Sequence, residues 1–220
     1  MGENRQVEYA VVDVETTGLD PTTDRVIDIG ILLVDSTGLV QGDWSSLVNP
    51  QRPVDATFIH GLTDEDVESA PAFSSLLPRV VELLRGRAVV AHNASFDIGF
   101  LNAEFARARY PVTIPRAAGV CTMDQSRIYL PPGRHNLSAC LERAGITLPV
   151  KHRSIADAQC SAALLTHYLE TELSGVRYAD TAQDRHGNLV LPREWERAAE
   201  AARSIQWLDI ADLGPATLNS

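Results

Sequence analysis

The stretch Tyr9-Ala-Val-Val-Asp13-Val-Glu15-Thr-Thr-Gly18 decides the fold. Its apolar, β-branched first half predicts a buried central strand over residues 7–14. Alternate residues of a strand project from the same face, so Asp13 and Glu15 point the same way. Two adjacent carboxylates repel each other and lose hydration, and a hard divalent cation between them would offset both penalties. The pair alone equally fits two acids at a solvated strand end.

Composition limits the classes of protein to which the chain can belong. The 220 residues, 45% hydrophobic and 22% charged, suit one well-buried domain with room for an appendage. No apolar run is long enough to span a membrane, and the N-terminus lacks the apolar core of a signal peptide. The three widely spaced cysteines argue against a disulfide framework or a zinc site, and we expect a cytoplasmic protein.

The charge is unevenly distributed. The formal net charge is −10, which is unfavourable for a protein that binds nucleic acid. Residues 107–153 nevertheless contain far more basic than acidic side chains. Their basic residues are Arg107, Arg109, Arg116, Arg127, Arg134, Arg143, Lys151 and Arg153. These residues either form a face that attracts phosphates or lie scattered over solvated helices, and the sequence leaves both arrangements open.

The chain alternates between strand and helix patterns. Strands are predicted over 25–35 and 40–48, with Ser36-Thr37-Gly38 as a hairpin turn between them. Further strands are predicted at 87–91 and 119–122, and helices at 73–84, from the residues after 93 to about 109, and at 124–130, 137–144 and 154–169. Pro78 would kink or split the first helix. This order predicts an α/β domain with a mixed sheet, its first strands antiparallel, flanked by helices.

The end of the chain differs in character. Turn-forming residues dominate 174–192, and a helix is predicted over 193–203. We therefore divide the chain into a domain of residues 7–173 and a C-terminal extension of residues 174–220. Two of the three tryptophans lie in this extension, which either covers the domain's own surface or docks a partner protein.

A further acid follows the predicted strand 87–91. Asp97 lies in the first turn of the next helix, after Asn93 or Ser95 as the N-cap. An acid at the positive end of a helix is favourable without any function. The same position, however, places Asp97 at the edge of the sheet where the first strand ends, and α/β folds build their sites at that edge.

His152 and Asp157 form the last polar group. Five residues turn a helix through about 500°, so the two side chains cannot stack on one helix. His152 must therefore precede the helix and Asp157 must lie in its first turn. Ser154 and Asp157 also have the spacing of a capping box, which would explain the acid without any chemistry.

Taken together, three motifs resemble the DEDDh group of 3′–5′ exonucleases and are similar to the proofreading epsilon subunit of bacterial DNA polymerase III. They are Asp13-Val-Glu15-Thr-Thr-Gly18, His92-Asn93-Ala-Ser-Phe96-Asp97 and His152-x-x-x-x-Asp157-Ala. The match covers about residues 7–170 and implies a ribonuclease H-like fold. The extension has no counterpart in it.

The resemblance also implies a mechanism. Asp13, Glu15, Asp97 and Asp157 would bind two divalent metal ions, Mg²⁺ or Mn²⁺, and His152 would be the general base. Nucleoside monophosphates would leave from the 3′ ends of single-stranded DNA, in proofreading or repair. The family's substrate contacts correspond to Thr16, Thr17, Gly18, Leu19, Ile59, His60, Asn93 and Phe96. Phe96 fits core packing equally well.

Three functions stay open. The first is the single-stranded DNA exonuclease, with a separate polymerase as partner through the extension, because a chain of this length has no room for a polymerase domain. The second is an exoribonuclease or oligonucleotide-degrading enzyme of the same group, since sugar choice depends on the surroundings of the 2′ position. The third is a non-catalytic, polymerase-associated binding module, against which all five catalytic-type residues argue.

Overall fold

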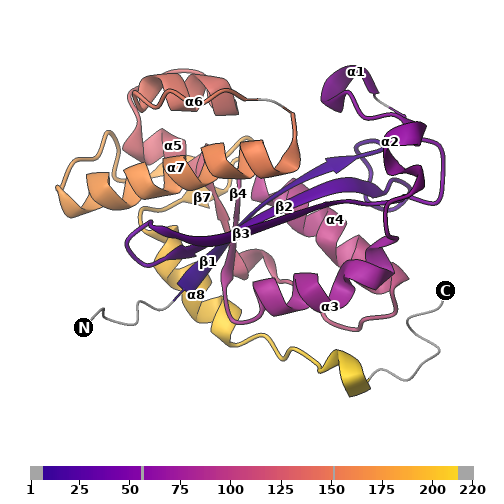
Figure 1. Cartoon of the computed structure of the whole chain (residues 1–220). Coiled ribbons are helices and arrows are strands. Elements are labelled where there is room, and N and C mark those ends of the chain that lie inside the picture. The colour runs from indigo at the N-terminus through magenta and orange to yellow at the C-terminus, as the bar shows by residue number, and fades with distance from the viewer. Residues whose placement is uncertain (1–6, 56, 151, 213–220) are drawn as a thin grey trace.

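A five-stranded mixed sheet lies at the centre of the computed structural model, which describes residues 7–55, 57–150 and 152–212 (Figure 1). The strands lie in the order β3-β2-β1-β4-β5, and β1 pairs antiparallel with β2 and parallel with β4. The five strands are β1 (Val7–Thr16), β2 (Val26–Asp35), β3 (Val40–Leu47), β4 (Ala88–Ala91) and β5 (Gly119–Cys121). The predicted mixed sheet with antiparallel first strands is confirmed.

Helices cover both faces of the sheet, with α7 over one face and α3 and α8 against the other (Figure 1). The α-helices are α1 (Thr57–His60), α2 (Asp64–Glu68), α3 (Phe73–Leu84), α4 (Ala94–Arg107), α5 (Thr122–Tyr129), α6 (Leu137–Arg143), α7 (Ser154–Leu173) and α8 (Glu194–Arg203). Short 3₁₀ turns, η1 (Arg116–Ala118) and η2 (Ile210–Asp212), and a small hairpin of β6 (Ala182–Gln183) and β7 (Leu189–Val190) complete the described elements. None of the described helices is long and apolar enough to cross a membrane.

The predicted helix 73–84 is a single helix, α3, that runs through Pro78. The prediction that Pro78 splits it is therefore wrong. Pro78 removes one backbone hydrogen bond, but α3 buries a whole face, including Phe73, Leu77 and Leu84, against the core. Packing of such a face contributes more to helix stability than one local bond.

The start of α7 corrects a second prediction. Ser154 and Asp157 do not form a capping box: Arg153 is the N-cap and Ser154 is already helical. Asp28 on β2, only 3% exposed, takes the place of a local cap. Its carboxylate accepts a hydrogen bond from the backbone N–H of Ser154 at 3.3 Å and pairs with the Arg153 guanidinium at 3.2 Å. The sheet itself thus fixes the first turn of α7.

The same turn of α7 packs closely over Gly30 on β2. A Cβ at Gly30 would lie 2.5 Å from the backbone nitrogen of Ile155. We expect Gly30→Ala to displace the first turn of α7 and to lower the free energy of unfolding by about 1–3 kcal/mol. Gly42 on β3 is the matched control, because a Cβ there meets nothing within 4 Å. Urea denaturation of both variants tests this, and equal stabilities would show that the contact relaxes without cost.

A buried ion pair joins α4 to the start of β2. Glu104, 1% exposed, accepts hydrogen bonds from Arg25 at 2.7 and 3.0 Å and from the backbone N–H of Val26 at 3.3 Å. We expect Glu104→Ala to cost about 3 kcal/mol, because it leaves a largely buried guanidinium without its counterion. Glu82→Ala removes only the exposed pair with Arg79 and should cost less than about 1 kcal/mol. Equal losses in chemical denaturation of the two variants would contradict this account.

The described part of the extension, residues 174–212, packs onto the domain. Trp195 on α8 is 3% exposed and lies in the main core, with its ring centroid 5.3 Å from that of Tyr129. Further along, the ring of Trp207 lies 6.4 Å from Phe105, and the carbonyl oxygen of Leu208 accepts a hydrogen bond from the Tyr110 hydroxyl. These residues therefore cover the domain's own surface. Residues 213–220 of the predicted extension lie outside the described residues, and a docking role stays a prediction.

The basic residues of 107–153 are largely engaged inside the fold. Arg107 pairs with Glu104, Arg116 with Asp184, Arg127 with Asp124, and Arg153 with Asp28. Arg143 donates to the backbone carbonyls of Ala139, Pro131 and Arg134. Lys151 lies outside the described residues. Most of the described members of this group therefore have a carboxylate or backbone carbonyl partner within the chain, which argues against one open cationic face.

Candidate active site

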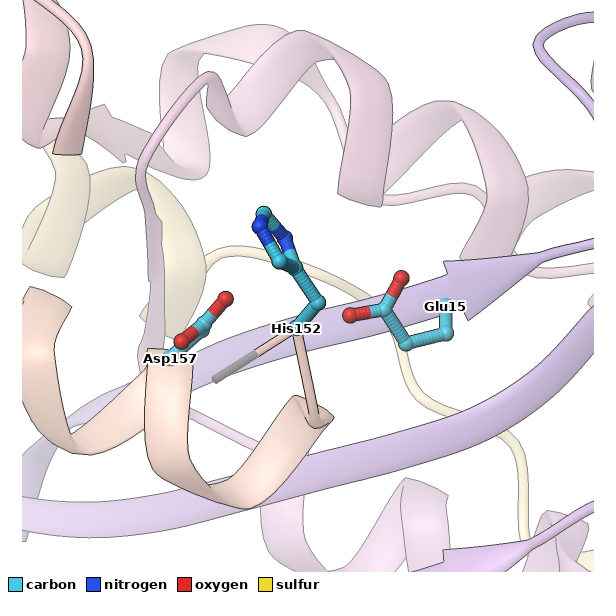
Figure 2. A group of neighbouring side chains, drawn as sticks. All are labelled: Glu15, His152 and Asp157. Carbon is cyan, nitrogen blue, oxygen red and sulfur yellow. The ribbon is translucent and has the colours of Figure 1, made fainter. Parts of the chain in front are cut away.

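The predicted acids converge at the edge of the sheet where β1 ends. Figure 2 shows Glu15 from β1, His152 from the residues before α7, and Asp157 from its first turn, all pointing into one space. One ligand atom from each lies within 4.8 Å of the others. His152 itself is exposed and has a left-handed backbone with φ of 49°. Residues far apart in the chain thus form one polar cluster.

Asp97 docks α4 onto the strand that carries the first two acids. Its side chain is 3% exposed, and one carboxylate oxygen accepts a hydrogen bond from the backbone N–H of Val14 at 3.2 Å. Burial raises the pKa of Asp97 to about 7, although that bond and one from its own backbone N–H oppose the shift. Asp97 therefore stands beside the β1 carboxylates, as its place in the sequence predicts.

The carboxyl groups of Asp13 and Glu15 lie close to other acidic groups in a largely buried place. Burial raises the pKa of Asp13 well above its usual range, and the charges of Asp97 and Glu15 add to the effect. Burial likewise raises the pKa of Glu15 to about 7, followed by the charges of Asp157 and Asp28. Such a set of carboxylate oxygens with one imidazole nitrogen fits a hard divalent cation such as Mg²⁺ or Mn²⁺, which would remove the repulsion.

These raised pKa values predict how the stability of the metal-free protein depends on pH. Glu15 and Asp97 keep protons up to a pKa of about 7 in the folded chain, against 4.5 and 3.8 for the free groups. The unfolded chain has released these protons at lower pH, so stability should fall as the pH rises from about 4 to about 7. Urea denaturation in EDTA across this window measures the slope. A stability that rises steadily over the same window would contradict the prediction.

The predicted substrate contacts after β1 form a tight turn. The Thr16 hydroxyl donates to the carbonyl of Gly18 at 2.6 Å, and the Thr17 hydroxyl donates to Asp24 at 3.3 Å. A Cβ at Gly18 would lie 2.4 Å from the Asp24 carboxylate, so only glycine fits there without a shift. Leu19, at the tip, is 81% exposed. The two hydroxyls thus shape the turn and leave Leu19 as its accessible apolar side chain.

Of the remaining residues predicted to contact substrate, Ile59 is exposed and the others are partly or fully buried. Ile59 is 47% exposed, whereas His60 is buried, with one ring nitrogen near the Asp55 carbonyl and the other accepting from the Leu62 N–H. Asn93 is the N-cap of α4 in a left-handed conformation with φ of 92°. Phe96 is half-buried and packs on the core, with its ring centroid 4.8 Å from that of Phe100.

Asp28 is the site residue that the sequence interpretation missed. It lies opposite Glu15 in the β1–β2 register, raises the pKa of Glu15, and holds Arg153 beside His152. Its signal in the sequence is an acid inside the otherwise apolar strand Val26-Ile-Asp-Ile-Gly30. A buried acid of this kind needs a partner, but the partner lies 125 residues away.

Comparison with known proteins identifies the family. The family model described as "Exonuclease" matches residues 10–165. The DNA polymerase III PolC-type protein of Bacillus cereus is 33% identical over 183 residues, covering 81% of this chain but 12% of the relative. The DNA polymerase III subunit epsilon of Treponema pallidum is 31% identical over 167 residues, covering 74% of this chain and 77% of the relative. The chain thus spans only a small part of the PolC-type relatives it matches.

Solved structures show the same fold. E. coli exonuclease I in complex with a dT13 oligonucleotide superposes with a TM-score of 0.65 at 19% identity, covering 77% of this chain and 43% of that one. Exonuclease X in complex with 5′-overhanging duplex DNA gives 0.58 at 27% identity, covering 76% and 93%. Fold and site together define a ribonuclease H-like nuclease, a hydrolase of phosphodiester bonds. The chain belongs to the exonuclease family, as its motifs predict.

Proposed function

We propose that this chain is a 3′–5′ exonuclease that releases nucleoside monophosphates from the 3′ ends of single-stranded DNA with the help of two divalent metal ions. The observation that carries the proposal is the convergence of Glu15, His152 and Asp157 within 4.8 Å. Asp13 and Asp97 lie near enough that, after burial, the charge of Glu15 also raises the pKa of each of them. Such a group of carboxylates is stable when cations bind it.

The five residues have distinct roles in this proposal. Asp13, Glu15, Asp97 and Asp157 would hold the ions, which would stabilise charge on the scissile phosphodiester and activate water. His152 would accept the proton of the attacking water, because its imidazole offers a basic nitrogen beside the carboxylates and this side chain is accessible. The water oxygen bonds to phosphorus, the bond from phosphorus to the 3′ oxygen of the preceding nucleotide breaks, and a nucleoside 5′-monophosphate leaves.

The substrate-binding residues would contact the base face, sugar and phosphate of the strand rather than the hydrogen-bonding edges of its bases. Leu19 and Ile59 are exposed apolar side chains in the segments predicted to contact the terminal nucleotide. Apolar contacts to a base face and contacts to sugar and phosphate carry little sequence information, so cleavage should depend weakly on sequence. The oligonucleotide complex of exonuclease I supports a single strand as the substrate.

The relatives support a replicative setting. DNA polymerase III PolC-type and epsilon proteins share this domain, which supports a proofreading or repair role beside a polymerase in the cytoplasm. Exposed apolar side chains lie where the domain meets the extension and suit a docking contact: Leu173, the last residue of α7, is 88% exposed, Tyr178 54% and Val176 49%. If Tyr178→Ala and Leu173→Ala recover the same proteins as the wild type in pull-downs, this contact is not the docking site.

The test of the function is digestion of matched 3′- and 5′-labelled single-stranded DNA and RNA with Mg²⁺, Mn²⁺ or EDTA. We expect metal-dependent release of mononucleotides from the 3′ end of DNA, lost in Asp13→Asn. Faster digestion of RNA would instead assign the chain to the exoribonuclease alternative. A folded, metal-loaded protein that cleaves neither strand would be a binding module.

A further inference from the structure

The small C-terminal hairpin is fixed against the domain. The carboxylate of Asp184 closes its turn by accepting hydrogen bonds at 2.8 Å from the backbone N–H groups of His186 and Asn188 and from the Asn188 side chain. Val190 is 3% exposed within the main core, and Gln125 of α5 donates to the carbonyl of Leu191 at 3.0 Å. The turn between β6 and β7 therefore has a fixed position relative to the domain.

A cavity of about 820 Å³ lies between this hairpin and α4. That volume is within the range of pockets that bind small ligands. Residues 93–95 and further residues of α4 line it, together with residues 184–186 and 188–190 of the hairpin. Its apolar lining includes Ile98, Ile114 and Leu189, and its cationic side chains are Arg116, Arg185 and Arg197. An apolar surface beside guanidinium groups suits a nucleotide, which combines a flat base with a phosphate.

The cationic side chains are not equally available to a ligand. Arg116 is paired with Asp184 at 3.1 Å. Glu194, which also lines the cavity, accepts from the Leu191 N–H, and burial raises its pKa. Arg185 is exposed, and its hydrogen bonds among the described residues go to the side-chain oxygen of Asn93 and a ring nitrogen of His186, both at 3.0 Å, and not to a carboxylate. Arg185 therefore offers a guanidinium charge that no described carboxylate neutralises.

The N-terminal end of α4 connects the cavity to the active site. Asn93 lines the cavity, and Asp97 of the catalytic cluster lies in the first turn of the helix that Asn93 begins. The Asn93 amide accepts from both Arg185 and Ser95 through its oxygen, so its NH₂ group is the end that can donate to a ligand. Arg185 thus contacts the N-cap of the helix whose first turn carries Asp97.

We propose that this cavity binds a nucleotide further along the same single strand, with its base on the apolar lining and a phosphodiester paired with Arg185. The inference rests on the proposed function, because it needs a strand in the active site. Arginine suits this role, since its planar fork pairs with phosphate oxygens through two hydrogen bonds. The contact is independent of sequence and holds the strand in register while its terminal nucleotide is cleaved.

The test compares two substrates of the full chain. One is a single-stranded DNA of about 12 nucleotides, which is long enough to fill a second subsite. The other is the p-nitrophenyl ester of thymidine 5′-phosphate, which has no second nucleotide. For Arg185→Ala we expect KM on the DNA to rise about 3- to 10-fold, with kcat and the ester kinetics unchanged. The slope of log KM against log salt should fall by about 0.7, because the variant neutralises one phosphate fewer on the single strand.

Arg79→Ala is the matched control, since Arg79 is an exposed arginine on α3 that pairs with Glu82. It should leave both substrates and the salt slope unchanged. If Arg185→Ala left KM and the salt slope on DNA unchanged, the proposal that this cavity binds a nucleotide would be overturned. If Arg185→Ala lowered kcat/KM equally on the DNA and on the ester, Arg185 would only orient Asn93.

Failure of the proposed function gives a different result, in which the wild type cleaves neither substrate. The binding of a fluorescently labelled strand to wild type and Arg185→Ala in EDTA then decides the inference by itself. A weaker affinity and a smaller salt slope in the variant would support the pocket. Equal affinities would overturn it.

Discussion

Replacing His152 by alanine should lower kcat on single-stranded DNA by about 10²–10⁴-fold, the usual contribution of a positioned general base. The imidazole lies within 4.8 Å of the Glu15 and Asp157 carboxylates, and the Arg153–Asp28 ion pair anchors the next residue to the sheet. His152 is exposed and contributes little to the core, so its loss should change chemistry rather than stability. Single-turnover rates together with the melting temperature separate these two effects.

The control for this variant is His167→Ala, which removes an imidazole from α7 away from the cluster. The four carboxylates remain in His152→Ala, so added Mn²⁺ should still raise its melting temperature about as much as in the wild type. Full activity in His152→Ala would remove the general-base assignment. Loss of the Mn²⁺ effect along with the activity would instead make His152 a metal ligand, consistent with the short distances in its cluster.

Most of the fold could be predicted because its signals are local. The alternation of Val12, Asp13, Val14 and Glu15 gives both the strand and the shared face of the acids. The hairpin between β2 and β3 could be predicted in the same way, since its turn is closed by Asp35, whose side chain accepts from the N–H of Thr37. A pattern of neighbouring residues is enough to specify such elements.

The missed features depend on contacts between distant segments. Asp28 caps α7 from 126 residues away, and Arg185 contacts Asn93 across 92 residues. No local pattern pairs such residues, so a capping box at Ser154 was the natural prediction and was wrong. Pro78 is a similar case, because the face that α3 buries against the core outweighs the local cost of the proline.

Asp13→Asn should have two effects of opposite sign. Activity should fall by about 10³-fold or more, because the variant loses a carboxylate that holds the ions that stabilise charge on the phosphate. The metal-free protein should become more stable, because burial and the charges of Asp97 and Glu15 all disfavour the Asp13 carboxylate. A gain of about 1 kcal/mol would raise the melting temperature by about 2–4 °C in a chain of this size.

The measurement is the melting temperature of wild type and variant in EDTA and in Mn²⁺ at a pH of about 8, which lies above the pKa of about 7 of Glu15 and Asp97. We expect Asp13→Asn to melt higher than the wild type in EDTA and to gain less from Mn²⁺. Asp43→Asn, an exposed acid on β3, should change neither value. If Asp13→Asn melted lower in EDTA and kept the full Mn²⁺ effect, Asp13 would be a structural residue, and the cation site would have to be formed by the other carboxylates alone.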